Sequence, residues 1–151
     1  MKKFLLFIIL IFSKNILANI VLHGTSIIYY EGKDNVALQL INNGKLSALV
    51  QLWIDDGNIN STPENSHSPF YVFPPIVKLA GLKGQQLKIM SHSLPKDRES
   101  VFYLNVLDIP PKPENTQGKN VLQLAIKSRI KLFYRLKELT TSQEEIYKNK
   151  L

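Results

Sequence analysis

Two adjacent carboxylates, Asp55 and Asp56, are a candidate pair for general acid–base chemistry. Neighbouring residues of a strand point to opposite faces, so two carboxylates next to each other in a strand do not converge on one substrate atom. Gly57 and Asn58 follow directly, and that composition is typical of a turn. We therefore interpret the pair as the end of a strand and the start of a turn.

The other residues that could do chemistry do not gather either. Three histidines without metal-ligand spacing are interpreted as solvated or locally bonded side chains: His23, His67 and His92. The chain has no cysteine, which excludes thiol catalysis and cysteine-based metal sites. The sequence therefore predicts no enzyme, no metal site and no cofactor.

Residues 121–135 carry a pattern that suits binding instead. Apolar side chains fall on one side of a period-two alternation: Leu122, Leu124, Ile126, Ile130, Leu132 and Tyr134. Polar and basic side chains fall on the other: Gln123, Lys127, Arg129, Lys131 and Arg135. This alternation predicts a half-buried strand. Its fifteen residues would span roughly 50 Å, whereas most strands have about five or six residues. Either the strand bends, or part of its apolar row meets a partner outside its own domain.

The rest of the chain predicts short strands separated by turns. They lie at residues 20–30, 36–41, 48–55, 70–73, 77–79, 87–90 and 101–106. Strands at roughly ten-residue spacing, with almost no helical periodicity, favour an all-β sandwich of about seven strands. Residues 19–136 are predicted to form this single domain.

The first eighteen residues have the composition of a secretory signal. Lys2 and Lys3 precede an apolar run at residues 4–12, and Ala18 suits the last position before cleavage. An uncleaved anchor is the alternative, but spanning a bilayer takes about 20 apolar residues, so we expect cleavage and no stable membrane insertion. Cleavage would remove three lysines and no acid, lowering the formal charge from +7 to +4. A chain this mildly basic is not expected to bind nucleic acid.

Six motifs, in order along residues 20–136, resemble the N-terminal domain of periplasmic pilus (fimbrial) assembly chaperones of the PapD-like family. They are Gly24-Thr-Ser-Ile-Ile-Tyr29, Leu49-Val-Gln-Leu-Trp-Ile-Asp55, Pro69-Phe-Tyr-Val-Phe-Pro-Pro75, Leu94-Pro-Lys-Asp-Arg-Glu-Ser-Val-Phe-Tyr-Leu-Asn105, Ile109-Pro-Pro111 and Ile130-Lys-Leu-Phe-Tyr-Arg135. The resemblance implies an immunoglobulin-like β-sandwich.

It also implies a function in the periplasm. Such chaperones capture pilus subunits by lending their last N-domain strand to a groove in the subunit, which is donor-strand complementation. By position in the motif, the donated side chains are Leu122, Leu124 and Ile126. The alternative is that these three residues belong to the chain's own core. The implied partners are pilus subunits and, through the complex, an outer-membrane usher that assembles the fibre.

The resemblance assigns an anchor for the subunit's C-terminal carboxylate, made in the family by an Arg and a Lys. Lys131 occupies the Lys position, but Ser26 stands where the family has Arg. A hydroxyl brings no charge, so we expect weaker carboxylate capture.

The family has a second immunoglobulin-like domain, and we expect this chain to lack it. Residues 137–151 match only the linker-like start of it. Glu99 and Arg135 match members of an ion network at the joint between the two domains. The alternative to a working chaperone is therefore a truncated or degenerate fragment that folds but no longer captures subunits.

Overall fold

A computed structural model describes residues 19–113, 118 and 120–137 of the chain. The predicted signal, residues 1–18, and the predicted tail beyond Lys137 lie outside the described residues. The described part contains nine strands. Their bounds are β1 Ile20–Leu22, β2 Ser26–Tyr30, β3 Val36–Asn42, β4 Ala48–Asp55, β5 Phe70–Phe73, β6 Ile76–Leu79, β7 Gly84–Ser91, β8 Ser100–Ile109 and β9 Ile126–Arg135.

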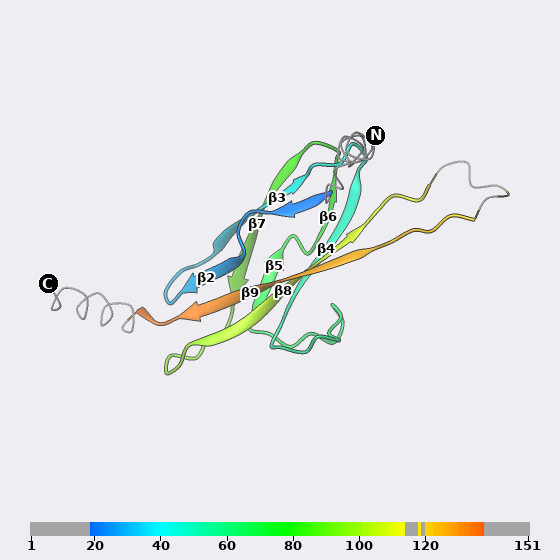
Figure 1. Ribbon diagram of the computed structural model, residues 1–151. Helices are drawn as coiled ribbons and strands as arrows, with labels where there is room; N and C mark the ends of the chain where they lie inside the picture. The colour runs from blue at the N-terminus through cyan, green and yellow to red at the C-terminus, as the bar shows by residue number, and fades with distance from the viewer. Residues whose placement is uncertain (1–18, 114–117, 119, 138–151) are drawn as a thin grey trace, which may run out of the picture.

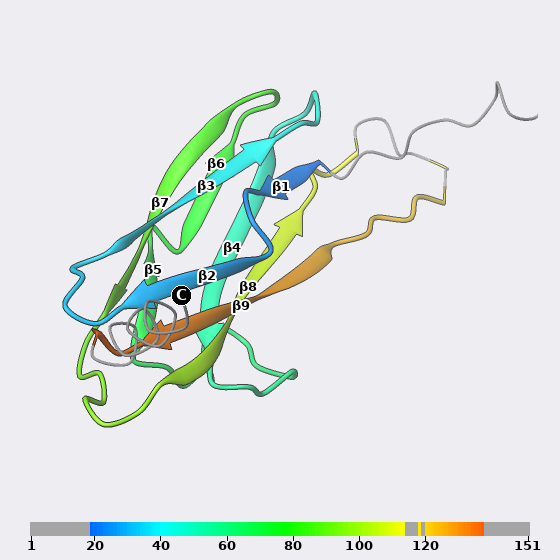
Figure 2. The ribbon, with the colours of Figure 1, turned by 60° about the vertical axis from the view of Figure 1, so that its left-hand side comes forward.

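The strands form two sheets that pack face to face, which confirms the predicted all-β sandwich (Figures 1 and 2). The first sheet has the strand order β1-β3-β7-β5, and the second sheet has the order β2-β9-β8-β4-β6. Alternate residues of each strand face the space between the sheets. The largest fully buried apolar side chains there are Tyr29, Tyr134, Leu40, Leu52, Leu87, Ile89, Leu104 and Leu132.

The predicted strand at residues 20–30 is wrong as a single element, because the chain changes sheet at Gly24. Strand β1 pairs antiparallel with β3 in the first sheet, whereas β2 pairs parallel with β9 in the second. Gly24 lies between them with φ of 99°, a conformation that a residue with a Cβ atom adopts only under strain. This division accounts for the nine strands of the described residues, where eight segments were predicted.

Replacing Gly24 by alanine should therefore destabilise the domain by about 1–2 kcal/mol, the usual cost of a non-glycine residue in such a conformation. Urea denaturation measures this change. Thr25→Ala is the matched control, because Thr25 is exposed and adjacent. Equal stability of the two variants would contradict the proposed role of Gly24.

The predicted strand at residues 121–135 is also corrected. Strand β9 begins only at Ile126, and its ladder with β8 starts where Ile126 lies opposite Asp108. Strand β8 ends one residue later at Ile109 and is followed by Pro110 and Pro111, which cannot donate ladder hydrogen bonds. In the part of the chain that the structure describes, residues 121–125 therefore have no neighbouring strand, and Figure 1 shows this segment running beyond the body of the sandwich.

Candidate functional site

The three predicted donor side chains are exposed to solvent. The exposed fraction is 82% for Leu122, 65% for Leu124 and 58% for Ile126. These values disagree with the alternative in which the three residues belong to the chain's own core. Their role in binding stays a prediction.

The same apolar row passes from solvent into the core as the strand proceeds. Ile126, Ser128 and Ile130 line an open cavity of about 300 Å³ between β9 and the short strand β1. Leu132 and Tyr134 then lie fully inside the sandwich, with exposed fractions of 0% and 1%. One face of a continuous segment thus changes from exposed at Ile126 to fully buried at Leu132.

Asp108 contributes a carboxylate to the same cavity, opposite Ile126 in the ladder. Its Oδ1 atom is buried without a hydrogen-bond partner, and this burial raises the pKa of Asp108 above its ordinary value. The start of β9 is therefore bordered by an apolar cavity with one unsatisfied acid.

The backbone of β9 has an open edge along its first half. Strand β2 pairs only with residues 131–135 of β9, beginning at Ser26 opposite Lys131. Residues 126–130 pair with β8 on one side and with no strand of the described chain on the other. An edge of this kind can take another strand by main-chain hydrogen bonding.

The structure brings together the two residues assigned to the carboxylate anchor. Ser26 and Lys131 are register partners in the parallel β2–β9 pair, and both side chains are exposed. Neighbouring strands lie about 4.8 Å apart, so one carboxylate could contact both residues.

The two residues assigned to the domain joint also lie near each other along the second sheet. The antiparallel ladder places Ser100 opposite Tyr134. Glu99 directly precedes Ser100 and Arg135 directly follows Tyr134, so these two residues come next to each other at the end of the ladder. Among the described residues, the two ion pairs are Arg98–Asp97 and Arg129–Asp55. The predicted Glu99–Arg135 network therefore remains a prediction.

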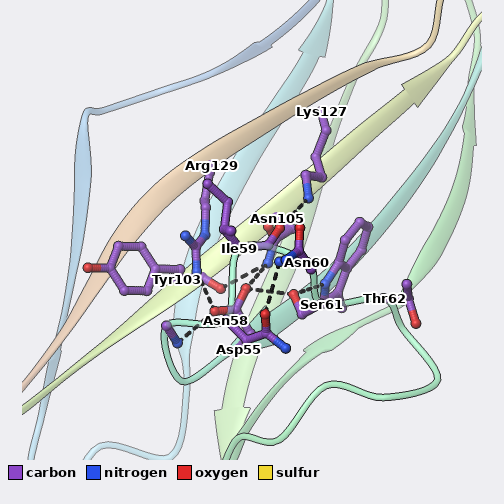
Figure 3. A network of polar contacts seen from close by, with 12 residues as sticks. Asp55, Asn58, Ile59, Asn60, Ser61, Thr62, Tyr103, Asn105, Lys127 and Arg129 are labelled. Atoms are coloured by element: carbon purple, nitrogen blue, oxygen red, sulfur yellow. Dashed lines mark hydrogen bonds and ion pairs between the residues drawn. The ribbon is translucent and has the colours of Figure 1, made fainter.

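A polar network that was not predicted from the sequence lies on the outer face of the second sheet (Figure 3). Its centre is the carboxylate of Asp55, which is 0% exposed. The carboxylate accepts bonds from Arg129 Nη2 at 2.5 Å, Asn105 Nδ2 at 2.6 Å, the backbone N of Gly57 at 2.7 Å and Ser61 Oγ at 2.8 Å.

Further contacts tie the segment after β4 to β9. Trp53 Nε1 donates to Ser61 Oγ at 3.0 Å, and Lys127 Nζ donates to the carbonyl of Ile59 at 3.0 Å. The guanidinium of Arg129 lies 4.0 Å from the ring centre of Tyr103. Residues of β4, β8, β9 and the segment after β4 are thus joined in one network.

The network determines the charge of Asp55. Burial alone would raise the pKa of its carboxyl group, but the hydrogen bonds from Asn105, Gly57, Ser61 and Arg129 outweigh burial and lower that pKa below its usual 3.8. Asp55 is therefore ionised at neutral pH and pairs with the positive charge of Arg129.

Local sequence reasoning was partly right about Asp55. The Gly57 amide does bond its side chain, as the turn interpretation of Asp55 to Asn58 requires. The ion pair joins residues 74 positions apart, and only the ladder registers bring them together. The signal present in the sequence was opposite charge at outward positions of two predicted strands.

The remaining candidates stay apart. The three histidines are exposed: His23, His67 and His92. Within the described ranges, no three His, Cys, Asp or Glu side chains gather in a way that could hold a metal ion. A search of the same residues finds no helix long and apolar enough to cross a membrane.

Comparison with known proteins gives one consistent result. The family profile described as "Pili and flagellar-assembly chaperone, PapD N-terminal domain" matches residues 19–140. The probable fimbrial chaperone YehC of Escherichia coli K12 is 50% identical over 120 residues, covering 78% of this chain and 50% of YehC. The chaperone protein HifB of Haemophilus influenzae is 43% identical over 143 residues, covering 91% of this chain and 58% of HifB.

Solved structures agree with these relatives. The crystal structure of the YadV chaperone superposes with a TM-score of 0.63 at 41% identity, covering 80% of this chain and 53% of that one. The structure of the Salmonella enterica SafA pilin in complex with the SafB chaperone also matches. The TM-score is 0.68 at 27% identity, covering 82% of this chain and 57% of that one. The chain spans about half the length of the curated relatives it matches. It belongs to the PapD N-terminal-domain family of pilus-assembly chaperones.

Proposed function

We propose that this protein is a periplasmic chaperone that binds pilus subunits by lending them residues 121–126 as a strand. The observation that supports this most is the exposure of three alternate apolar side chains at the point where the chain meets the start of the β8–β9 ladder. A solved relative, SafB, was captured in complex with a pilin, SafA. The proposal extends that kind of partner to this chain.

The geometry suits addition of a strand to a subunit. Leu122, Leu124 and Ile126 share one side of the alternation, so all three can enter one groove. Fully burying three such side chains contributes about 5–9 kcal/mol before the cost of association. Main-chain hydrogen bonds between the subunit and the open edge of β9 at residues 126–130 would fix the register of this apolar contact.

The carboxylate anchor can be tested by restoring charge. Ser26→Arg would place a guanidinium beside Lys131, because these two positions are register partners. A charge-assisted hydrogen bond contributes about 1.5–3 kcal/mol, so we expect subunit affinity to rise by roughly tenfold or more. Isothermal titration calorimetry with a purified pilus subunit measures the change.

Two controls isolate the anchor. Thr25→Arg adds the same charge one residue earlier, outside β2, and should change affinity little. A subunit with an amidated C-terminus should lose the gain made by Ser26→Arg. An equal gain with both forms of the subunit would contradict carboxylate capture.

A second candidate function is favoured by Ser26 itself, because the anchor keeps only one of its two basic groups. In this candidate the chain folds but does not capture subunits. No measurable complex for the parent and no gain from Ser26→Arg would favour it over the chaperone.

Export belongs to the same proposal. We infer that residues 1–18 direct the chain to the periplasm and are removed after Ala18, with an outer-membrane usher as the later partner of the complex. The proposed activity is binding alone, without a catalytic residue or a cofactor. Mass spectrometry of the chain isolated from the periplasm should give a mature protein that begins at Asn19.

A further inference from the structure

Among the described strands, the first half of β9 pairs with only one other strand. Residues 126–130 have only β8 beside them, while residues 131–135 lie between β2 and β8. Backbone pairing on one side only means that this half lacks the second ladder that holds residues 131–135. The donor row is continuous with this weakly held half, so something else must fix its direction.

Two basic side chains on this half reach across the sheet. Arg129 bonds the buried carboxylate of Asp55, and Lys127 bonds the carbonyl of Ile59 (Figure 3). Both acceptors belong to β4 or to the segment after it, on the far side of β8 from β9. The two contacts therefore hold β9 to the body of the sandwich along the half of β9 with which β2 does not pair.

The Arg129–Asp55 contact is stronger than an ordinary surface pair. The Asp55 side chain is 1% exposed and the Arg129 side chain is 21% exposed, so water screens this pair far less than it screens exposed ions. By comparison, the side chains of the Arg98–Asp97 pair are 73% and 77% exposed. Of the two ion pairs in the described chain, only Arg129–Asp55 can constrain a strand.

The contact also specifies register. Arg129 lies opposite Asn105, which bonds the same carboxylate. A slip of β9 by one residue would turn Arg129 toward the apolar core, and a slip by two would carry it past Asp55. Only the observed register lets the guanidinium reach Asp55.

We propose that Arg129, held by Asp55, is a positioning residue that fixes the register and direction of β9 and thereby aims the donor row. The consequence for binding rests on the proposed chaperone function. The effect on β9 itself does not, so the two can be tested separately.

Hydrogen exchange of the free chain tests the effect on β9. In Arg129→Gln, exchange of the residue 126–130 amides that pair with β8 should accelerate at least about tenfold more than exchange in β3, whose acceleration reports the global loss of stability. Lys131→Gln is the matched control, because Lys131 is an exposed cation on the same face of the same strand. Arg129→Lys, which keeps the charge but not the planar fork, should fall between the two.

A purely structural role gives a different pattern. In that case Arg129→Gln would accelerate exchange in β3 and β9 equally, which would overturn the proposal. Unchanged exchange at residues 126–130 would overturn it as well. If Arg129→Gln does not fold, the double variant Asp55→Asn/Arg129→Gln, which leaves no unpaired charge, carries the same test.

Titration with a purified pilus subunit tests the consequence for binding. Well below the melting temperature, Arg129→Gln should weaken subunit affinity about tenfold. Lys131→Gln is a control for exchange in β9 only, which it should leave unchanged, because Lys131 also belongs to the proposed carboxylate anchor. Faster exchange at residues 126–130 without any change in subunit affinity would contradict the role of Arg129 in aiming the donor row. A parent chain that binds no subunit, with the exchange pattern as expected, would overturn the proposed function and still support the role of Arg129 in fixing the register of β9.

Discussion

Leu124→Asp should abolish subunit binding, with an affinity loss of at least about 100-fold, and leave the fold intact. The side chain is 65% exposed in the free chain, so the substitution should change the free energy of unfolding by less than about 0.5 kcal/mol. In the complex the same position would bury an unpaired carboxylate in an apolar groove, at a cost of several kcal/mol. Calorimetric titration with a purified pilus subunit measures the affinity, and thermal denaturation measures the stability.

Gln123→Asp is the matched control for this experiment. It introduces the same charge one residue earlier, on the opposite side of the alternation, where the side chain would point out of the groove. We expect at most a few-fold loss of affinity from it. Similar losses for both variants would argue for a general effect of charge and against alternate insertion.

Asp55→Asn should produce the largest loss of stability in this part of the chain. Removing one partner of a buried ion pair typically costs about 3–5 kcal/mol, and the partial exposure of Arg129 places the expected value near 3 kcal/mol. Four donors converge on the two carboxylate oxygens, so an amide nitrogen in place of one oxygen would face donors rather than acceptors. A melting temperature lower by roughly 10 °C corresponds to this change.

The neighbouring residue provides the control. Asp56→Asn removes the same charge from an exposed side chain and should change the unfolding free energy by less than about 0.5 kcal/mol. Equal effects of the two substitutions would show that the net charge, rather than the network, is responsible.

The pH dependence of stability follows from the lowered pKa of Asp55. A carboxyl group whose pKa is lower in the folded chain than in the unfolded chain contributes stability above the unfolded value of about 3.9. That contribution is lost as the pH falls through the folded pKa. The stability difference between parent and Asp55→Asn should therefore be constant near neutral pH and shrink below about pH 4. A constant difference down to pH 2 would contradict ionisation of Asp55.

Local sequence signals were enough to place most strands. The alternation around Trp53, followed by a turn composition, gave β4 with the bounds Ala48–Asp55 that the structure has. Residues 70–73 were likewise predicted with the bounds of β5, Phe70–Phe73. Both strands end where a turn or a proline pair interrupts the alternation, and such interruptions are visible in the sequence.

The errors at the first and last strands have a different cause. Residues 20–30 alternate well enough for one strand, but a positive φ at Gly24 sends the two halves to different sheets. Residues 121–125 alternate like the rest of β9, yet no strand of the described residues lies beside them because β8 ends at Ile109. Whether a segment is paired depends on the length of its neighbour, which its own sequence does not encode.

The candidate site divides in the same way. The apolar row Leu122, Leu124 and Ile126 can be predicted from its alternation and from family resemblance. The pairing of Arg129 with Asp55 was missed because it depends on the registers of β4, β8 and β9 together. Interactions that cross three strands cannot be derived from the composition of any one of them.

Among the described residues, the backbone of residues 121–125 has no neighbouring strand in the free chain, and we expect it to become a strand in the complex. Amide hydrogen exchange, measured on the free chain and on its complex with a purified pilus subunit, tests this directly. We expect fast exchange throughout the segment in the free chain and protection of its bonded amides in the complex, with protection also along the open edge of β9. A stable complex in which these amides still exchange at the rate of the free chain would contradict donation of the strand.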